Sequence, residues 1–127
     1  MLTEAKIRQF AHDWIAAWNS HSLEGVMTHY AAEVTLISPA AATILKDESG
    51  TVAGREALYA YFKRGLEVYP DLKFELLDVM CGISSVVLYY INQKGTRTGE
   101  YMEFDSNGRV IKVVSNYSTE KDKQDSA

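Results

Sequence analysis

The chain has 127 residues and is poor in several features that mark particular protein classes. Its single cysteine, Cys81, cannot form an internal disulfide, which is typical of a protein from a reducing compartment. Two prolines and eight glycines are too few for a collagenous or low-complexity chain. No apolar run reaches the length of a membrane span, and the N-terminal residues do not resemble a secretory signal peptide. We therefore expect a cytoplasmic protein that does not contact membranes.

Positive charge is also scarce. The chain has 13 Lys and Arg against 17 Asp and Glu, and its densest basic stretch is the pair Lys63–Arg64. A nucleic-acid-binding domain needs a basic stripe that neutralises several phosphates, so we expect no nucleic-acid partner. The three histidines are not spaced as metal ligands, and no glycine-rich phosphate loop is present. We therefore expect neither a metal ion nor a cofactor.

The composition is that of one compact domain, with 46% hydrophobic residues and 8 Tyr, 4 Phe and 2 Trp. Apolar side chains recur with helical spacing after Thr3, a plausible N-cap: Ile7, Phe10, Ala11, Trp14, Ile15 and Trp18. A second helix is predicted over residues 22–32. A third is predicted over residues 54–69, where Pro70 ends it.

The rest of the chain reads as strands and loops. We predict a strand over residues 33–38, which Pro39 stops, and a loop over residues 40–53. Strands follow at residues 72–77 and 86–91, and two more, at 97–105 and 109–117, flank the turn signal Asn107–Gly108. Residues 119–127 are charged and are expected to form a disordered tail. Three helices followed by an antiparallel meander indicate an α+β fold.

The alternation in residues 99–105 is the most informative local pattern. Glu100, Met102 and Phe104 share one face of this predicted strand. Because strand side chains alternate between faces, burial of the two apolar residues also buries Glu100. The sequence thus predicts a carboxyl group inside an apolar, aromatic concavity. Two roles remain open for Glu100: an acid or hydrogen-bond donor in a pocket, or a carboxylate paired with a nearby Lys or Arg.

The other candidate pocket residues are mostly aromatic and lie on faces that we predict to point inward. Trp14 and Trp18 are one helical turn apart and form either a wall of the pocket or part of the core. Inward-facing tyrosines need hydrogen-bond partners for their hydroxyl groups, and one or two are expected to line the pocket. The candidate ligand-binding residues are Trp14, Trp18, Tyr30, Ser38, Tyr61, Tyr90, Met102, Phe104, Val113, Ser115 and Tyr117.

Several short segments, in this order and spacing, are similar to the nuclear transport factor 2-like superfamily. They are AWNSH at 17–21, LEGV at 23–26, YAAEVT at 30–35, GREAL at 54–58 and EFDSNGRV at 103–110. The resemblance is to the SnoaL-like and ketosteroid-isomerase-like members. It implies one domain over residues 1–118, in which a strongly curved antiparallel sheet wraps three helices around an interior pocket. It also implies a homodimer formed through the outer face of the sheet.

The site of the isomerases is only partly present. By this resemblance, the general-base aspartate corresponds to Ser38 and the oxyanion-hole tyrosine to Trp14. Glu100 matches their second oxyanion donor, a carboxylic acid that an apolar site keeps protonated. The departures at the base and the tyrosine argue against ketosteroid isomerisation itself, whereas the carboxyl group remains.

Three functions stay open. The chain is an isomerase, cyclase or hydratase acting on a small hydrophobic or ring-bearing molecule, with Glu100 as the acid–base group and Tyr30, Tyr117 and Ser38 orienting the substrate. Alternatively, the same pocket binds a ligand without converting it. As a third possibility, the domain assembles with itself or another protein through outward-facing residues such as Val87, Tyr89 and Ile91.

Overall fold

The computed structural model describes residues 2–121, which fold as a sheet with helices on its inner side. Within that range the helices are α1 (Glu4–Asn19), α2 (Leu23–Met27), α3 (Pro39–Leu45) and α4 (Arg55–Val68). The strands are β1 (Tyr30–Ile37), β2 (Thr51–Ala53), β3 (Glu75–Cys81), β4 (Ser85–Ile91), β5 (Thr96–Phe104) and β6 (Val110–Lys121). They form a single sheet in the order β2-β1-β6-β5-β4-β3.

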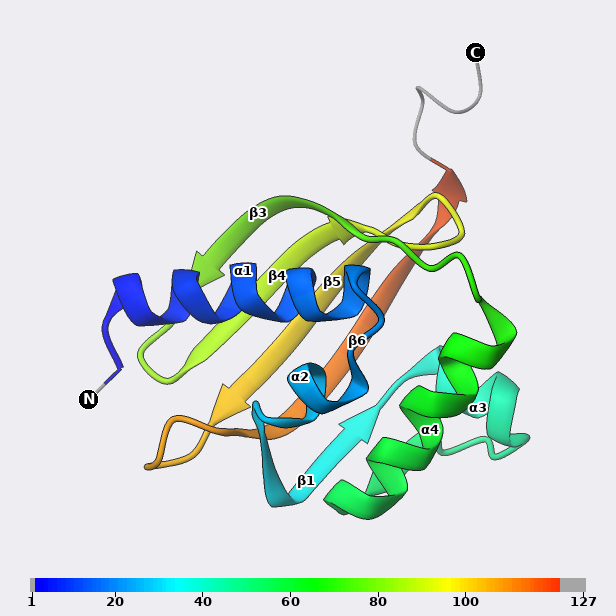
Figure 1. The fold of residues 1–127 in the computed structure, drawn as a ribbon, viewed down its shortest axis with the longest axis horizontal. Coiled ribbons are helices and arrows are strands. Elements are labelled where there is room, and N and C mark those ends of the chain that lie inside the picture. Colours follow the sequence, from blue (N-terminus) through cyan, green and yellow to red (C-terminus); the bar gives the residue numbers. More distant parts are fainter. Residues whose placement is uncertain (1, 122–127) are drawn as a thin grey trace.

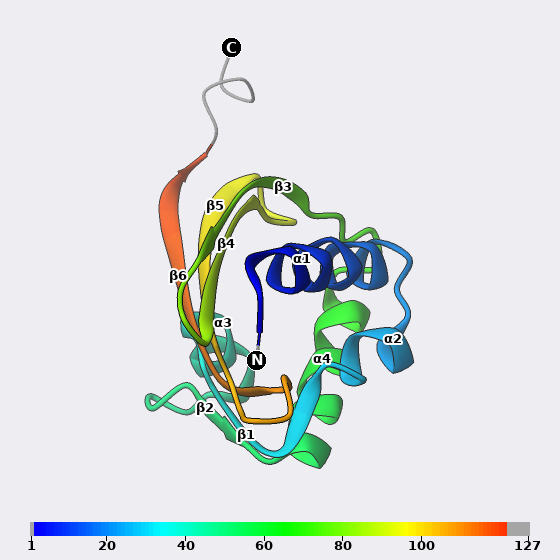
Figure 2. The same cartoon turned by 90° about the vertical axis from the view of Figure 1, so that its left-hand side faces the viewer.

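The sheet curls around the helices. Figures 1 and 2 show α1 lying inside the curve of β3 to β6, with α2 and α4 continuing the inner layer beside β1. The core lies between these layers, where the inner stripe of α1 (Ile7, Ala11, Trp14 and Trp18) meets the inner faces of the strands. No helix within residues 2–121 is long and apolar enough to cross a membrane.

Helix α1 forms as its sequence predicts. The Thr3 hydroxyl accepts a hydrogen bond from the backbone N–H of Lys6 at 3.2 Å, which satisfies one of the free donors at the helix start. Glu4 in the first turn faces the positive end of the helix dipole. The third predicted helix is likewise present as α4, which ends just before Tyr69 and Pro70.

The second helix is shorter than predicted, because α2 ends at Met27 and β1 already begins at Tyr30. Tyr30 pairs with Val110 of β6, and the Val110 N–H donates to the carbonyl of His29 at 2.8 Å. The hydrogen bonds between β1 and β6 therefore satisfy backbone groups that a longer α2 would have paired within the helix. This stabilisation by the sheet outweighs the local helix propensity of residues 28–32.

The predicted loop at residues 40–53 was wrong, because it contains α3 and β2. Ser38 caps α3, its hydroxyl accepting from the Ala40 N–H at 3.1 Å, and Pro39 occupies the first turn. A Ser–Pro pair before several alanines is a helix start, because proline at that position lacks only an N–H that would be unpaired anyway. Gly50, with φ of +59°, lies so close to Ser38 that an added Cβ would be 2.5 Å from the Ser38 carbonyl oxygen.

The sheet is mixed rather than antiparallel, and the helices number four rather than three in residues 2–121. Strand β1 pairs in parallel with β6, while its other neighbour, β2, is antiparallel. A parallel pair requires a long crossover, and here the six elements α3, β2, α4, β3, β4 and β5 intervene between the two strands. Strand β6 runs on to Lys121, so residues 119–121 of the predicted tail belong to a strand. Residues 122–127 lie outside the described residues.

The turn after α1 is fastened to the chain segment that leads into β3. The Asn19 side chain donates to the Phe74 carbonyl at 2.9 Å and accepts from the Phe74 N–H at 2.7 Å. His21, at a φ of 59°, places Nε2 2.8 Å from the Leu72 carbonyl oxygen. These bonds hold Leu72 and Phe74 against the end of α1, where both side chains contribute to the site.

Candidate functional site

A cavity of about 440 Å³ lies between the helices and the inner face of the sheet. Glu100 and nine of the eleven other candidate residues line it: Trp14, Trp18, Tyr30, Ser38, Tyr61, Tyr90, Val113, Ser115 and Tyr117. These residues come from α1, α4, strands β1, β4, β5 and β6, and the N-cap of α3, so the wall is assembled from segments far apart in the chain.

Met102 and Phe104 do not line this cavity and are corrections to the sequence prediction. Both are buried, Met102 completely, on the same face of β5 as Glu100. They lie farther along β5, and Phe104 packs edge-on against Phe10 of α1 with ring centroids 5.1 Å apart. The alternation correctly placed them inside, but which part of the interior is open depends on how closely α1 approaches the sheet.

Part of the lining was not predicted from the sequence. The aromatic and aliphatic walls also include Phe62, Tyr69, Leu72 and Phe74, and the β4–β5 turn adds Asn92, Gln93, Lys94 and Thr96. The alternation at residues 72–77 was a usable signal for Leu72 and Phe74. Nothing in the local sequence indicated that the β4–β5 turn would reach the cavity, because this depends on the curvature of the sheet.

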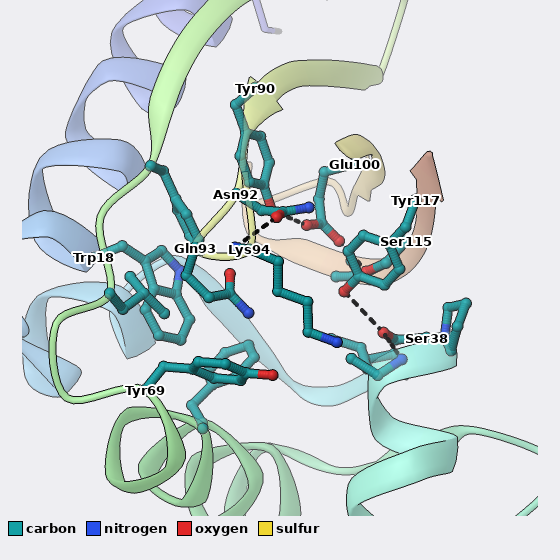
Figure 3. Close-up of a pocket in the computed structure, with 18 of the residues that line it drawn as sticks. Trp18, Ser38, Tyr69, Tyr90, Asn92, Gln93, Lys94, Glu100, Ser115 and Tyr117 are labelled. Atoms are coloured by element: carbon teal, nitrogen blue, oxygen red, sulfur yellow. Dashed lines mark hydrogen bonds between the residues drawn. The ribbon is translucent and has the colours of Figure 1, made fainter. Parts of the chain in front are cut away.

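Glu100 is the centre of the polar part of the cavity. It is 5% exposed, and two hydroxyl groups donate to its carboxyl oxygens. The Tyr90 hydroxyl is 2.5 Å from Oε1, and the Ser115 hydroxyl bonds to Oε2. Glu100 forms no ion pair within residues 2–121, so the alternative of a carboxylate paired with Lys or Arg does not describe the structure. Figure 3 shows this group facing Tyr117 and Ser115.

Burial raises the pKa of Glu100 above its usual value, because ionisation would place an unpaired charge in a poorly solvated site. The hydrogen bonds from Ser115 and Tyr90 act in the opposite direction, and burial dominates. A carboxyl group that retains its proton can donate a hydrogen bond or a proton to a ligand oxygen. Burial and then the neighbouring Glu100 also raise the pKa of Tyr90 well above its usual value, so Tyr90 remains a neutral donor.

A second polar pair, Ser38 and Tyr117, lies beside this group. The Ser38 Oγ and the Tyr117 hydroxyl oxygen are 3.1 Å apart, and Ser38 is 2% exposed. Tyr117 as a whole is 37% exposed, but its hydroxyl reaches inward to Ser38. Burial, followed by the nearby Glu100, raises the pKa of Tyr117 to about 12. Ser38 is the residue that the sequence resemblance aligned with the isomerase base, and it is not a carboxylate.

Both tryptophans line the cavity while also packing into the core. The Trp14 Nε1–H donates to the Tyr30 hydroxyl at 2.9 Å, and both residues are buried. Trp14 also stacks on Phe74 with ring centroids 5.8 Å apart. The Trp18 Nε1–H is buried and has no hydrogen-bond acceptor within the described part of the chain. Each tryptophan therefore serves both as part of the cavity wall and as part of the core.

The fold and the site define an α+β cone with a largely aromatic interior cavity and one buried carboxyl group. Residues 11–123 match the family described as SnoaL-like domain, and the chain belongs to that family. Within residues 2–121, no group of three or more His, Cys, Asp or Glu residues is arranged to hold a metal ion. The nuclear transport factor 2-like fold that the sequence resemblance implied is therefore confirmed.

Among solved structures, the chain is similar to a SnoaL-like protein of unknown function from Burkholderia thailandensis. The two share 35% identity over 91% of this chain and 97% of that one, with a TM-score of 0.88. A protein from Agrobacterium tumefaciens, provisionally described as an isomerase of the SnoaL-like family, shares 14% identity over 90% and 98% of the chains, with a TM-score of 0.71. A provisionally described hydroxylase from Streptomyces galilaeus shares 18% identity over 91% and 81%, with a TM-score of 0.70. No functionally curated protein matches the sequence.

Proposed function

We propose that the cone binds a small, mostly apolar, ring-bearing molecule and that Glu100 donates a hydrogen bond or a proton to an oxygen atom of that molecule. The observation that carries this proposal is the state of Glu100: buried, bonded to two hydroxyl groups, without a cationic partner in residues 2–121, and facing a cavity. A buried carboxyl group without a counter-ion is costly for folding, and such groups concentrate at functional sites.

The size and the lining of the cavity support a ring-bearing ligand. A cavity of about 440 Å³ lies within the range of small-molecule sites. Trp18, Phe62 and Phe74 present aromatic surfaces, and apolar rings pack favourably against such surfaces. The polar groups of the lining include Glu100 with its hydroxyl partners, the Ser38–Tyr117 pair and the β4–β5 turn.

If the ligand is converted, the reaction is an isomerisation, cyclisation or hydration with Glu100 as the acid–base group. Tyr30, Tyr117 and Ser38 would then orient the substrate. One acid–base group contributes roughly 10²–10⁴-fold to a rate. No carboxylate occupies the base position at Ser38, so the substrate would need an already acidic or reactive centre. The same cavity serves equally as a binding site without turnover, which is the alternative function.

The first test compares two neutral probes with a naphthalene body, the ketone acetonaphthone and the hydrocarbon ethylnaphthalene. Quenching of Trp14 and Trp18, the two tryptophans of the chain, reports occupancy of the cavity. We expect the ketone to bind more tightly at low pH and to lose this advantage as the pH rises and Glu100 gives up its proton. In Glu100→Gln the amide keeps a donor, so the ketone's advantage should persist at all pH values.

Glu103→Gln is the matched control, since Glu103 lies on the same strand but accepts from Tyr101 on the other face. It should behave like the wild type. A failure of both probes to bind would contradict the proposed pocket, and a pH-independent ketone preference in the wild type would contradict the role of Glu100. For any substrate found by native mass spectrometry of the purified protein, turnover that survives Glu100→Gln would exclude Glu100 as the acid–base group. A molecule that the wild type binds but does not convert would leave only the binding function.

We also propose that two chains associate through the outer face of the sheet. An apolar row crosses five neighbouring strands of that face in register: Met80, Val87, Tyr101, Val114 and Ile37. Its ends, Met80 and Ile37, are 49% and 37% exposed. Continuous exposed apolar surface of this kind favours association. Sedimentation should give a dimer that Val87→Lys converts to a monomer, and a wild type that stays monomeric at all concentrations would refute the proposal.

A further inference from the structure

In the part of the chain that the structure describes, two cavity-lining residues carry a side chain that is ordinarily charged at neutral pH, Glu100 and Lys94. Glu100 is buried in the inner face of β5, whereas Lys94 is exposed and belongs to the β4–β5 turn at the mouth. Figure 3 shows the Lys94 side chain extending from that turn across the cavity in the direction of Ser38.

The turn that carries Lys94 is held by a buried side chain. Asn92 is 6% exposed and donates to the hydroxyl groups of Thr96 and Thr98, both at 2.8 Å. Its Oδ1 accepts from the backbone N–H groups of Lys94 at 3.0 Å and Thr96 at 3.3 Å. The backbone of Lys94 is therefore fixed relative to the cavity, which lowers the entropy cost of placing its ammonium group there.

Among the donors of this cavity, one charged group and one buried N–H have no acceptor within residues 2–121. The Lys94 ammonium forms no ion pair and no side-chain hydrogen bond there, and the buried Trp18 Nε1–H has none either. A buried N–H without an acceptor costs free energy in the folded protein, so its presence in a cavity wall indicates that a ligand atom accepts from it. Oxygen atoms with available lone pairs can accept a hydrogen bond from either group.

We propose that the ligand of this cavity is a ring-bearing anion, whose carboxylate or comparable oxyanion is bound by Lys94 at the mouth while its ring system lies against the aromatic wall. The inference rests on the proposed function, because it presupposes that the cavity binds a ring-bearing molecule. An anionic group is less costly to place at the solvated mouth than in the apolar interior. The end of the cavity near Glu100 then receives a neutral oxygen of the same molecule.

Two fluorescent probes with the same aromatic body test this inference: anilinonaphthalene sulfonate, which is anionic, and N-phenyl-naphthylamine, which is neutral. Energy transfer from Trp14 and Trp18 identifies the molecules bound inside the cavity. We expect Lys94→Gln to weaken binding of the sulfonate about three- to tenfold, the range for a charge-assisted contact at an exposed site, and to change binding of the neutral probe by less than about twofold. Added salt should weaken only the sulfonate.

The matched control is Lys63→Gln, since Lys63 is an exposed lysine of α4 outside the cavity lining. It should leave both affinities unchanged. Equal effects of Lys94→Gln on both probes, or no effect on either, would overturn the anion inference while leaving the pocket in place. If neither probe transfers energy in the wild type, the proposed binding function itself fails.

Discussion

We expect the free energy of unfolding to depend on the charge state of Glu100, and Glu100→Gln tests this directly. The amide has nearly the same shape, accepts from Tyr90 through its oxygen and donates to Ser115 through its nitrogen, so the packing is retained. What the substitution removes is the ability to titrate. The free energies of unfolding of the two proteins should therefore differ mainly in their dependence on pH.

The sign follows from the raised pKa of Glu100 in the folded state. Above the usual pKa of a glutamate, the unfolded chain has lost this proton while the folded chain still holds it, so stability falls as the pH rises. The contribution of Glu100 to stability is complete at pH values below its pKa in the unfolded chain. It is lost as the pH rises to its pKa in the folded protein. Within that window the wild type loses about 1.4 kcal/mol per pH unit relative to Glu100→Gln.

Urea denaturation of both proteins at pH values from about 4 to 8 measures this difference, and subtraction removes the other carboxyl groups from the comparison. Buried carboxylates without ion pairs generally show this sign. A difference that stays constant with pH, or one in which the wild type gains stability as the pH rises, would show that the two hydroxyl donors outweigh burial. The assignment of a neutral Glu100 would then be refuted.

Two further predictions concern the walls of the cavity. Tyr30→Phe removes the acceptor of the Trp14 N–H and should lower the free energy of unfolding by about 1–3 kcal/mol. The control Tyr89→Phe changes a half-exposed contact with Arg97 and should lower it by less than about 0.5 kcal/mol. Equal losses for the two variants in urea denaturation would contradict the role of the buried bond. Asn19→Ala leaves the backbone N–H and carbonyl of Phe74 without their partners. It should lower the free energy of unfolding by about 1–3 kcal/mol and weaken binding of the neutral probe. An unchanged affinity would show that the Phe74 segment keeps its position without Asn19.

Local patterns predicted those parts of the fold in which one short segment contains all the information needed. The cap at Thr3 and the apolar stripe of α1 lie within one helix, and the alternation of β5 alone placed Glu100 on the buried face. The same kind of local signal was present but misread at Ser38–Pro39, where α3 begins. The error there came from the charged stretch at 46–50, which is the loop that follows the helix.

Other features depend on residues that are far apart in the chain, so no local pattern could specify them. The parallel pairing of β1 with β6 joins strands that are separated in the chain by six elements, and it shortened α2 by recruiting Tyr30 into a strand. The partners of Glu100 come from β4 and β6, and which of several inward hydroxyl groups reach it depends on strand register. Curvature of the sheet decided that Lys94 lines the cavity, and the approach of α1 to the sheet decided that Met102 does not.

The sequence by itself determined that a carboxyl group would be buried among aromatic side chains, because the two-residue period of a strand forces Glu100 to share the face of Met102 and Phe104. Only the tertiary structure decided what that burial means. Glu100 meets two hydroxyl groups rather than a cation, and it faces open space rather than packed core. Its protonation depends on the solvent, charges and dipoles within a few ångströms, and these are contributed by strands that the chain brings together only on folding.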